Sequence, residues 1–551
     1  MDDEKKYERW TKEALIKRIQ FLEADLLRAG EHNSETPRDS AVVEEAAASP
    51  PPKKKRVERE IDPSKYSTRL VAFKLAYLGK RYGGFEFAAH AKFPSIEEAL
   101  WKAFVKARLI LPDNPDEVNW DAWEYSKCGR TDRGVSAFGQ VIAVRVRSNR
   151  PLPKKEEPAE AEEGENNGNE TAAETAKEKR EFNDFRDELP YCRILNKLLP
   201  PDIRALAWCP TTPAGFSARY DCRERQYRYF FTQPAFAPIP QTLENPEMAK
   251  TTKVKGGWLN IDAMRQAAKK FEGLHDFRNF CRVDPGKLNI NFERRVFESD
   301  IVEVKDAQTA LPYLDHDEFK PPSISEFGLE EGSTQKLPKV YYFHVRGTAF
   351  LWHQIRCMVS VLFMVGQGLE DPSITEKLLD IEAEPRRPNY QLADEVPLVL
   401  WDCLFPRAEK PENALNWVYL GEENPLNQHG VTGLLNQTWE YWHQRKMEEL
   451  LSSQLLNVVS SQADITLRKD PKAPPYIPAT TRMYEGGDKD RLMGKYQPLL
   501  KKTRLPSPQF VFDREARRKG YADAADMRVA LAKKKEAAIA AELASLEEGI
   551  E

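Results

Sequence analysis

The chain has 551 residues, of which 41% are hydrophobic and 31% are charged, and its formal net charge is −4. This length allows two or three domains, and the small net charge neither indicates nor excludes a nucleic-acid partner. A Glu-rich stretch at residues 156–178 offsets a basic stretch from Arg193 to Arg228, so the charge must be judged locally. No apolar run has the length of a membrane span and no signal-peptide core begins the chain, which predicts a soluble protein.

The seven cysteines show no spacing typical of a metal site. They include no Cys-x-x-Cys pair, and no cluster of His and Cys has ligand spacing. We therefore expect reduced thiols in an intracellular protein, with no metal and no cofactor. A zinc site assembled from cysteines far apart in the sequence is the alternative that this reasoning leaves open.

The N-terminal 66 residues predict a helix followed by a linker. Apolar residues recur at helical spacing within residues 1–29, which predicts one amphipathic helix. Residues 30–66 are polar and predict a flexible linker, in which the basic run 51–57 favours import into the nucleus. We expect the protein in nucleus and cytoplasm; the alternatives for the basic run are a solvated charge run or a segment that helps to hold RNA.

The next part of the chain, residues 67–250, alternates strands and helices. We expect strands at 69–78, 140–147, 203–209 and 226–232, and helices at 95–108 and 191–199. Residues 151–185 lack apolar periodicity and predict a disordered insertion. The order of these elements predicts an α+β fold with a mostly antiparallel sheet.

A second half is predicted over residues 256–405. It would hold helices at 261–271 and 350–366, a loop at 273–277, strands at 294–304, 340–346 and 395–403, and an insertion at 306–337. Residues 406–551 predict a C-terminal extension with helical patches, which we expect to be largely poorly ordered.

The most informative segment places Asp132 between Arg130 and Arg133 on a short turn bounded by glycines. A carboxylate beside guanidinium groups stays ionised and lies where a polyanion would bind, as a nucleophile for RNA chemistry must. The simpler reading is a plain turn, since Asp and Gly both favour turns for local reasons.

The run Gly129-Arg130-Thr131-Asp132-Arg133-Gly134-Val135 resembles the active-site loop of TruA-type tRNA pseudouridine synthases. Three further elements of that family are matched in the same order, at residues 73–85, at 216–219 with 226–229, and at 346–356. The resemblance implies two RRM-like halves that form one continuous, mainly antiparallel sheet with flanking helices, a central RNA cleft, and usually a homodimer.

The resemblance also implies roles for individual residues. Asp132 would be the nucleophile, Arg356 its salt-bridge partner, and Tyr227 the tyrosine that stacks on uracil and assists proton transfer. The sequence does not distinguish attack on C1′ from stabilisation of a charged intermediate or removal of a 2′ proton. The simpler readings are an arginine extending from the edge of the core for Arg356 and an ordinary strand residue for Tyr227.

Binding of RNA is expected to involve a wider set of residues. The target base must be flipped out of its arm, and Arg130 resembles the family residue that fills the vacated space. Leu398 would form an apolar floor under the uracil, although a plain core position is the simpler reading, and His353 is expected to be structural. The candidate phosphate contacts are Arg133, Arg219, Arg225, Arg228 and Lys74.

The run Ser136–Gln140, together with residues 350–358, most resembles the eukaryotic members that modify positions 38 and 39 of the tRNA anticodon arm. We therefore expect tRNA as the partner and uridine isomerisation without a cofactor as the reaction. The alternatives are the same chemistry at another site in tRNA or small nuclear RNA, and a non-catalytic protein that binds RNA or assists tRNA folding.

Overall fold

The computed structural model describes residues 62–152, 181–238, 257–305, 338–406, 414–462, 481–493 and 495–548. The predicted N-terminal helix, the basic run and the 306–337 insertion lie outside these residues, as does most of the 151–185 insertion. No helix in the described part of the chain is both long and apolar enough to cross a membrane.

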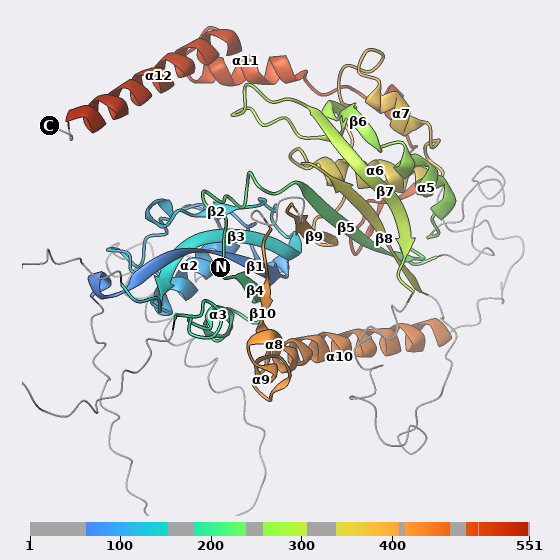
Figure 1. Cartoon of the computed structure of the whole chain (residues 1–551). Coiled ribbons are helices and arrows are strands. Elements are labelled where there is room, and N and C mark those ends of the chain that lie inside the picture. Colours follow the sequence, from blue (N-terminus) through green and yellow to red (C-terminus); the bar gives the residue numbers. More distant parts are fainter. Residues whose placement is uncertain are drawn as a thin grey trace, which may run out of the picture. The chain divides into compact units, whose positions relative to one another are not determined.

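A ten-stranded sheet forms the centre of the described structure (Figure 1). Its strand order is β10-β4-β1-β3-β9-β5-β8-β7-β6, with the short β2 paired to β3. The strands are β1 (Ser67–Tyr77), β2 (Ser126–Lys127), β3 (Ser136–Ser148), β4 (Ile203–Cys209), β5 (Glu224–Gln233), β6 (Gly273–Asp276), β7 (Glu293–Glu303), β8 (Lys339–Gly347), β9 (Leu398–Leu404) and β10 (Val418–Tyr419). Among these strands only β3 and β9 pair in parallel, so the predicted mainly antiparallel α+β fold is confirmed.

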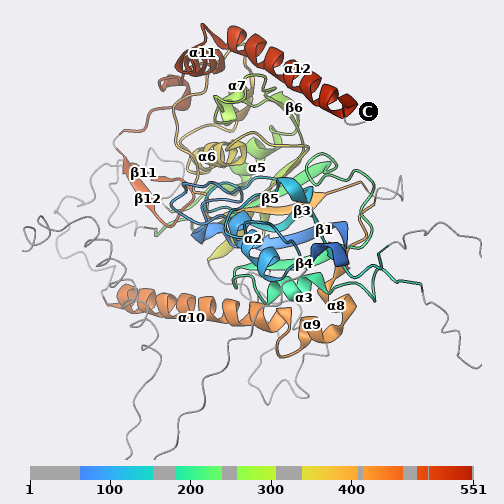
Figure 2. The same cartoon turned by 90° about the vertical axis from the view of Figure 1, so that its left-hand side faces the viewer.

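Helices flank the sheet (Figure 2). They include α2 (Ile96–Lys106), α3 (Tyr191–Asn196), α5 (Ile261–Lys269), α6 (Gln354–Gly366) and α7 (Ile374–Leu379). Helix α2 begins where expected because the Ser95 hydroxyl accepts a hydrogen bond from the Glu98 N–H at 3.1 Å. Two expectations were wrong locally: residues 273–276 form strand β6 rather than a loop, and α6 begins at Gln354 rather than at Phe350.

The buried side chains form two cores, one on each side of the β3–β9 junction. One core contains β1, β3, β4, α2 and α3, and the other contains β5, β7, β8, α5 and α6. Strand β5 falls within the predicted N-terminal half, yet its residues Tyr229 and Phe231 pack in the second core. Tyr227 contacts both cores, because it lies on the strand next to their junction.

The C-terminal extension is more ordered than expected, and this is the largest correction to the fold. Its elements are α8 (Leu420–Glu423), α9 (Pro425–His429), α10 (Leu434–Ser461), β11 (Thr481–Tyr484), β12 (Asp490–Met493), α11 (Pro508–Arg518) and α12 (Ala524–Glu548). Met483, Tyr484, Leu499 and Phe512 are buried in the second core. Tyr229 on β5 also donates a hydrogen bond to the Gly486 carbonyl at 2.5 Å, so this part of the extension completes the fold.

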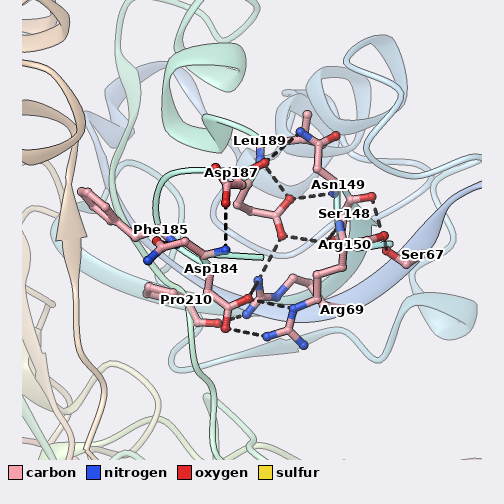
Figure 3. A network of polar contacts seen from close by, with 12 residues as sticks. Ser67, Arg69, Ser148, Asn149, Arg150, Asp184, Phe185, Asp187, Leu189 and Pro210 are labelled. Carbon is pink, nitrogen blue, oxygen red and sulfur yellow. Dashed lines mark hydrogen bonds and ion pairs between the residues drawn. The ribbon is translucent and has the colours of Figure 1, made fainter. Parts of the chain in front are cut away.

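The end of the 151–185 insertion is also tied to the sheet (Figure 3). Arg69 on β1 forms ion pairs with Asp184 at 3.2 Å and with Glu188 at 3.0 Å, and Arg150 pairs with Asp184 at 2.6 Å. The Ser148 hydroxyl donates to the buried Glu188 carboxylate at 2.6 Å. The expected disorder is therefore wrong for residues 181–185, because Asp184 neutralises two arginines at the ends of β1 and β3.

Candidate active site

The Asp132 loop, residues 128–135, connects β2 to β3 and is held on both sides. The buried Gln140 side chain accepts from the Gly129 N–H at 3.2 Å and donates to the Gly129 carbonyl at 2.7 Å. Tyr77 and Thr131 share a hydrogen bond of 2.7 Å, and the Val135 N–H closes the turn on the Asp132 carbonyl at 3.1 Å. The carboxylate of Asp132 therefore extends from a rigid turn.

Glycines allow a second loop to approach this turn closely. Gly84 adopts a φ of +124°, and a Cβ atom there would lie 3.0 Å from the Thr131 carbonyl oxygen. That carbonyl accepts a hydrogen bond from the Phe85 N–H at 3.0 Å. At Gly79 a Cβ would lie 2.0 Å from the Val135 carbonyl oxygen, so only glycine fits at this position.

Asp132 opens into a cavity of about 850 Å³ whose walls come from both halves of the sheet. Eight of the ten site residues predicted from the sequence line this one cavity: Asp132, Tyr227, Arg356, Arg130, Arg133, Arg219, Arg225 and Leu398. They lie up to 268 positions apart in the chain, between Arg130 and Leu398. The fold therefore assembles most of the candidate site.

The predicted salt bridge between Asp132 and Arg356 is not formed. Arg356 instead donates to the Glu395 carboxylate at 2.7 Å and to the Ala393 carbonyl at 2.7 Å. Burial raises the pKa of the Asp132 carboxyl above its ordinary value, and the positive charge of Arg356 opposes this shift. The positive charge of Arg356 thus stabilises the Asp132 carboxylate without a hydrogen bond between them. The hydrogen bonds of Arg356 instead hold Ala393 and Glu395, which precede β9.

His353 is the ionisable residue whose contact with Asp132 sequence reasoning missed. Its Nε2 lies 3.5 Å from the Asp132 Oδ2, and the side chain is 10% exposed. Burial and the positive charges of Arg356 and Arg282 lower the pKa of His353 to about 4, so the imidazole is neutral at physiological pH. The residue adopts a left-handed φ of 60° at the start of α6, a conformation that costs roughly 1–2 kcal/mol for a side chain with a Cβ. Only its position within the matched 346–356 element could have indicated this contact.

The apolar part of the cavity suits a planar base. The Tyr227 and Phe350 rings pack edge to face with centroids 5.3 Å apart, and Leu398 lines the same cavity. Burial raises the pKa of Tyr227, so its phenol stays protonated near neutral pH. An aromatic and aliphatic lining of this kind can pack against the flat face of a planar group.

Arginines surround the opening of the cavity. Arg130 is exposed and pairs with Glu86 at 3.0 Å, and Arg133 lies over the Phe93 ring at 4.4 Å. Arg219 is exposed beside Tyr220, which is 77% exposed. These three guanidinium groups can therefore contact an anion that enters from solvent.

Arg225 lines the cavity and also links its walls, while its contact with phosphate stays a prediction. Its guanidinium donates to the carbonyl groups of Cys128 at 2.9 Å, Thr348 at 2.8 Å and Arg219 at 3.3 Å. Because these three carbonyls belong to three separate segments of the cavity wall, Arg225 holds the wall together.

Two predicted phosphate contacts do not line the cavity. Lys74 forms an ion pair with Asp402 at 3.0 Å. Arg228 follows Tyr227 on β5, and side chains of adjacent strand residues point to opposite faces. Its guanidinium lies over the Trp401 ring at 3.7 Å and the Tyr342 ring at 4.5 Å. The structure therefore brings neither Lys74 nor Arg228 into the cavity, and their contact with phosphate stays a prediction.

A second cavity of about 550 Å³ shares Trp352 and Asp284 with the first. Five arginines line it: Arg278, Arg282, Arg386, Arg387 and Arg514. Arg278 is neutralised by Asp276 at 2.7 Å, whereas Arg282 lies over the Trp352 ring at 4.4 Å. Residue Arg514 comes from α11, so the C-terminal extension contributes positive charge next to the candidate active site.

Comparison with known proteins identifies the family. The model of a family described as tRNA pseudouridine synthase matches residues 267–406. The tRNA pseudouridine(38/39) synthase of Bos taurus is 36% identical over 78% of this chain and 71% of its own length. The human enzyme of that name is 35% identical over 75% of this chain and 69% of its own length, and the Saccharomyces cerevisiae enzyme is 34% identical over 74% and 73%.

The chain belongs to the tRNA pseudouridine synthase family. The resemblance inferred from the Asp132 loop is therefore confirmed, and the chain is an isomerase that acts on tRNA. For a tRNA pseudouridine synthase, the geometry described above brings the Asp132 carboxylate, an apolar lining that includes Tyr227, Phe350 and Leu398, and several arginines into a single cavity.

Proposed function

We propose that this chain converts uridine to pseudouridine at positions 38 and 39 of the tRNA anticodon arm, with Asp132 as the nucleophile. The observation that carries the proposal is the single cavity in which Asp132, Tyr227 and Leu398 meet beneath exposed arginines. The positions are those in the names of the bovine, human and yeast relatives.

The reaction breaks the bond between N1 of uracil and C1′, rotates the base, and joins C5 to C1′. The hydrogen on C5 leaves and N1 gains one, so no redox equivalent and no nucleotide is consumed. We therefore propose that the chemistry needs no cofactor. Because the Tyr227 phenol stays protonated, it serves as a stacking surface and hydrogen-bond donor rather than as the initial base.

The proposal places RNA across the junction of two RRM-like halves, with the target base flipped into the cavity. Arg130 would enter the space that the base leaves, since its side chain is exposed at the rim. Arg282, Arg386 and Arg514 extend the positive surface beyond the cavity, so the phosphates of the arm would follow this direction.

We also propose a homodimer in the nucleus and cytoplasm. Helix α10 supports the dimer because it has no buried residue and carries several exposed apolar side chains. Those on its second half are Leu450, Leu451, Leu455, Leu456, Val458 and Val459. Several exposed apolar side chains on one helical segment are typical of a protein–protein contact.

The test uses tRNA transcripts that carry tritium at C5 of uridine, because isomerisation releases that hydrogen to water. Purified protein should release tritium from a tRNA with uridine at positions 38 and 39 and not from the same tRNA with cytidine there. Asp132→Asn should stop release while tRNA binding persists, and Asp121→Asn, an exposed residue outside the cavity, should behave as wild type.

Other outcomes would select the alternatives. Release from the cytidine-substituted tRNA would indicate another target site, in tRNA or in small nuclear RNA. Binding without release by the wild-type protein would indicate a non-catalytic RNA-binding protein. Normal release by folded Asp132→Asn would overturn the assignment of the nucleophile.

A further inference from the structure

Three cysteines that are far apart in the sequence meet beneath the candidate active site. Cys128 begins the Asp132 loop, Cys222 precedes β5, and Cys403 lies on β9. All three are buried, and their Sγ atoms lie within 4.8 Å of one another. Of the seven cysteines, these three form the single His/Cys/Asp/Glu group of metal-binding size among the residues that the structure describes.

We propose that Cys128, Cys222 and Cys403 bind one zinc ion. Zinc bound by thiolates has Zn–S distances of about 2.3 Å in a tetrahedral arrangement, which places the sulfurs about 3.8 Å apart. Separations of at most 4.8 Å reach that value when the thiols shift by less than about 1 Å. Thiolates are also the ligands that zinc prefers over carboxylates in such buried sites.

The charge of the site fits a divalent ion. Three thiolates and Zn²⁺ carry a net charge of −1, and the guanidinium of Arg225 adds +1. Arg225 is placed for this role because it donates to the Cys128 carbonyl at 2.9 Å and lies opposite Cys403 in the β5–β9 register. A buried site with balanced charge avoids the cost of an uncompensated ion.

The three cysteines leave one of the four zinc ligands to be supplied by another group. No fourth ligating side chain belongs to the group among the described residues, so a solvent molecule would occupy the fourth position. Binding would release the thiol protons, and the affinity for zinc would therefore increase with pH.

The ion would act as a clamp on the cavity. It would join the Asp132 loop, the segment that leads from Phe216–Arg219 into β5, and strand β9. Cys128 is four positions before Asp132, and Leu398 lies on the same strand as Cys403. A zinc ion would therefore hold the nucleophile and the apolar wall in register without contacting the substrate.

The first test measures zinc in the full chain purified without chelators and without a histidine tag. We expect about one zinc per chain. Cys403→Ser should lower the zinc content at least tenfold, whereas Cys192→Ser, a buried cysteine of the same core outside the cluster, should leave it unchanged. Equal zinc in Cys403→Ser and wild type would overturn the proposal.

A second test covers the case in which Cys403→Ser does not fold. Wild-type protein stripped of metal is titrated with Cd²⁺, and thiolate-to-cadmium charge-transfer absorption should reach its limit at one equivalent. Reaction of the denatured protein with a thiol reagent should also count seven free thiols, as no disulfide is proposed. Absence of both zinc and the cadmium absorption, or a disulfide within the cluster, would overturn the proposal. Neither readout depends on the target of the enzyme.

Discussion

The burial of Tyr484 makes the C-terminal extension part of the enzyme's core, and its removal provides a direct test. The side chain is 4% exposed, and its ring lies 4.9 Å from that of Phe363 and 6.0 Å from that of Phe236. Substituting a buried large aromatic residue by alanine costs about 3–5 kcal/mol, because the packing is lost and a cavity remains. Tyr484→Ala should therefore destabilise the catalytic unit although it lies in the extension.

The expected shift in melting temperature follows from the size of the folded unit. An unfolding entropy of roughly 2.1 cal/mol/K per residue gives about 0.8 kcal/mol/K for about 400 folded residues. A loss of 3–5 kcal/mol then lowers the midpoint by roughly 4–6 °C.

Differential scanning fluorimetry of the full chain measures this shift. Phe510→Ala on α11 is the matched control, because that ring is 53% exposed and its loss should cost less than about 0.5 kcal/mol. A midpoint for Tyr484→Ala that equals wild type would refute the packing argument, as would an equal shift in both variants.

Three further outcomes are expected. Burial raises the pKa of Asp132 in the folded chain, so the charge of this carboxylate opposes folding at neutral pH. Asp132→Asn should therefore raise the melting temperature at neutral pH. This gain should vanish well below the ordinary carboxyl pKa, because the carboxyl group is then protonated in both the folded and the unfolded state. Replacing Arg386 and Arg514 by alanine should weaken tRNA binding and lower the salt slope by about one unit or slightly less per lost phosphate contact, while Arg228→Ala should leave the slope unchanged, as measured by filter binding over a salt series. Leu455→Glu on α10 should shift sedimentation toward the monomer, and an unchanged distribution would argue against α10 as the dimer contact.

The sequence predicted the central sheet well because its strands carry strong local signals. Strand 203–209 was placed at its observed bounds, and β1 and α2 within two residues at each end. The four-residue β6 was missed because its Gly, His and Asp content favours a turn, and only pairing with β7 makes it a strand. Where the local sequence preference was weak, pairing with a neighbouring strand thus determined the secondary structure.

The position of a site residue was predictable where the residue belongs to a sequence motif. It was not predictable where it depends on a contact with a residue far away in the chain. Asp132, Tyr227 and Leu398 reach the cavity as expected. The partner of Arg356 could not be predicted, because Glu395 is 39 positions away and lies in no matched motif. The C-terminal extension was misjudged since its buried residues are sparse and lie between Pro-rich segments, so no periodicity indicates their burial.

The parallel pairing of β3 with β9 has a consequence for how this enzyme is made. Ser136 and Ala137 on β3 pair with Val399 and Leu400 on β9. The two halves of the sheet are therefore joined by residues that the ribosome synthesises far apart in time. At ~5–20 residues per second, Leu398 follows Asp132 by about 13 to 53 s. Throughout that interval Ser136 and Ala137 of β3 lack their partner strand β9, and the cavity lacks the lining that Leu398 provides. The start of β3 in the nascent N-terminal half therefore stays unpaired until β9 has been synthesised. The active site is complete only after the second half has left the exit tunnel.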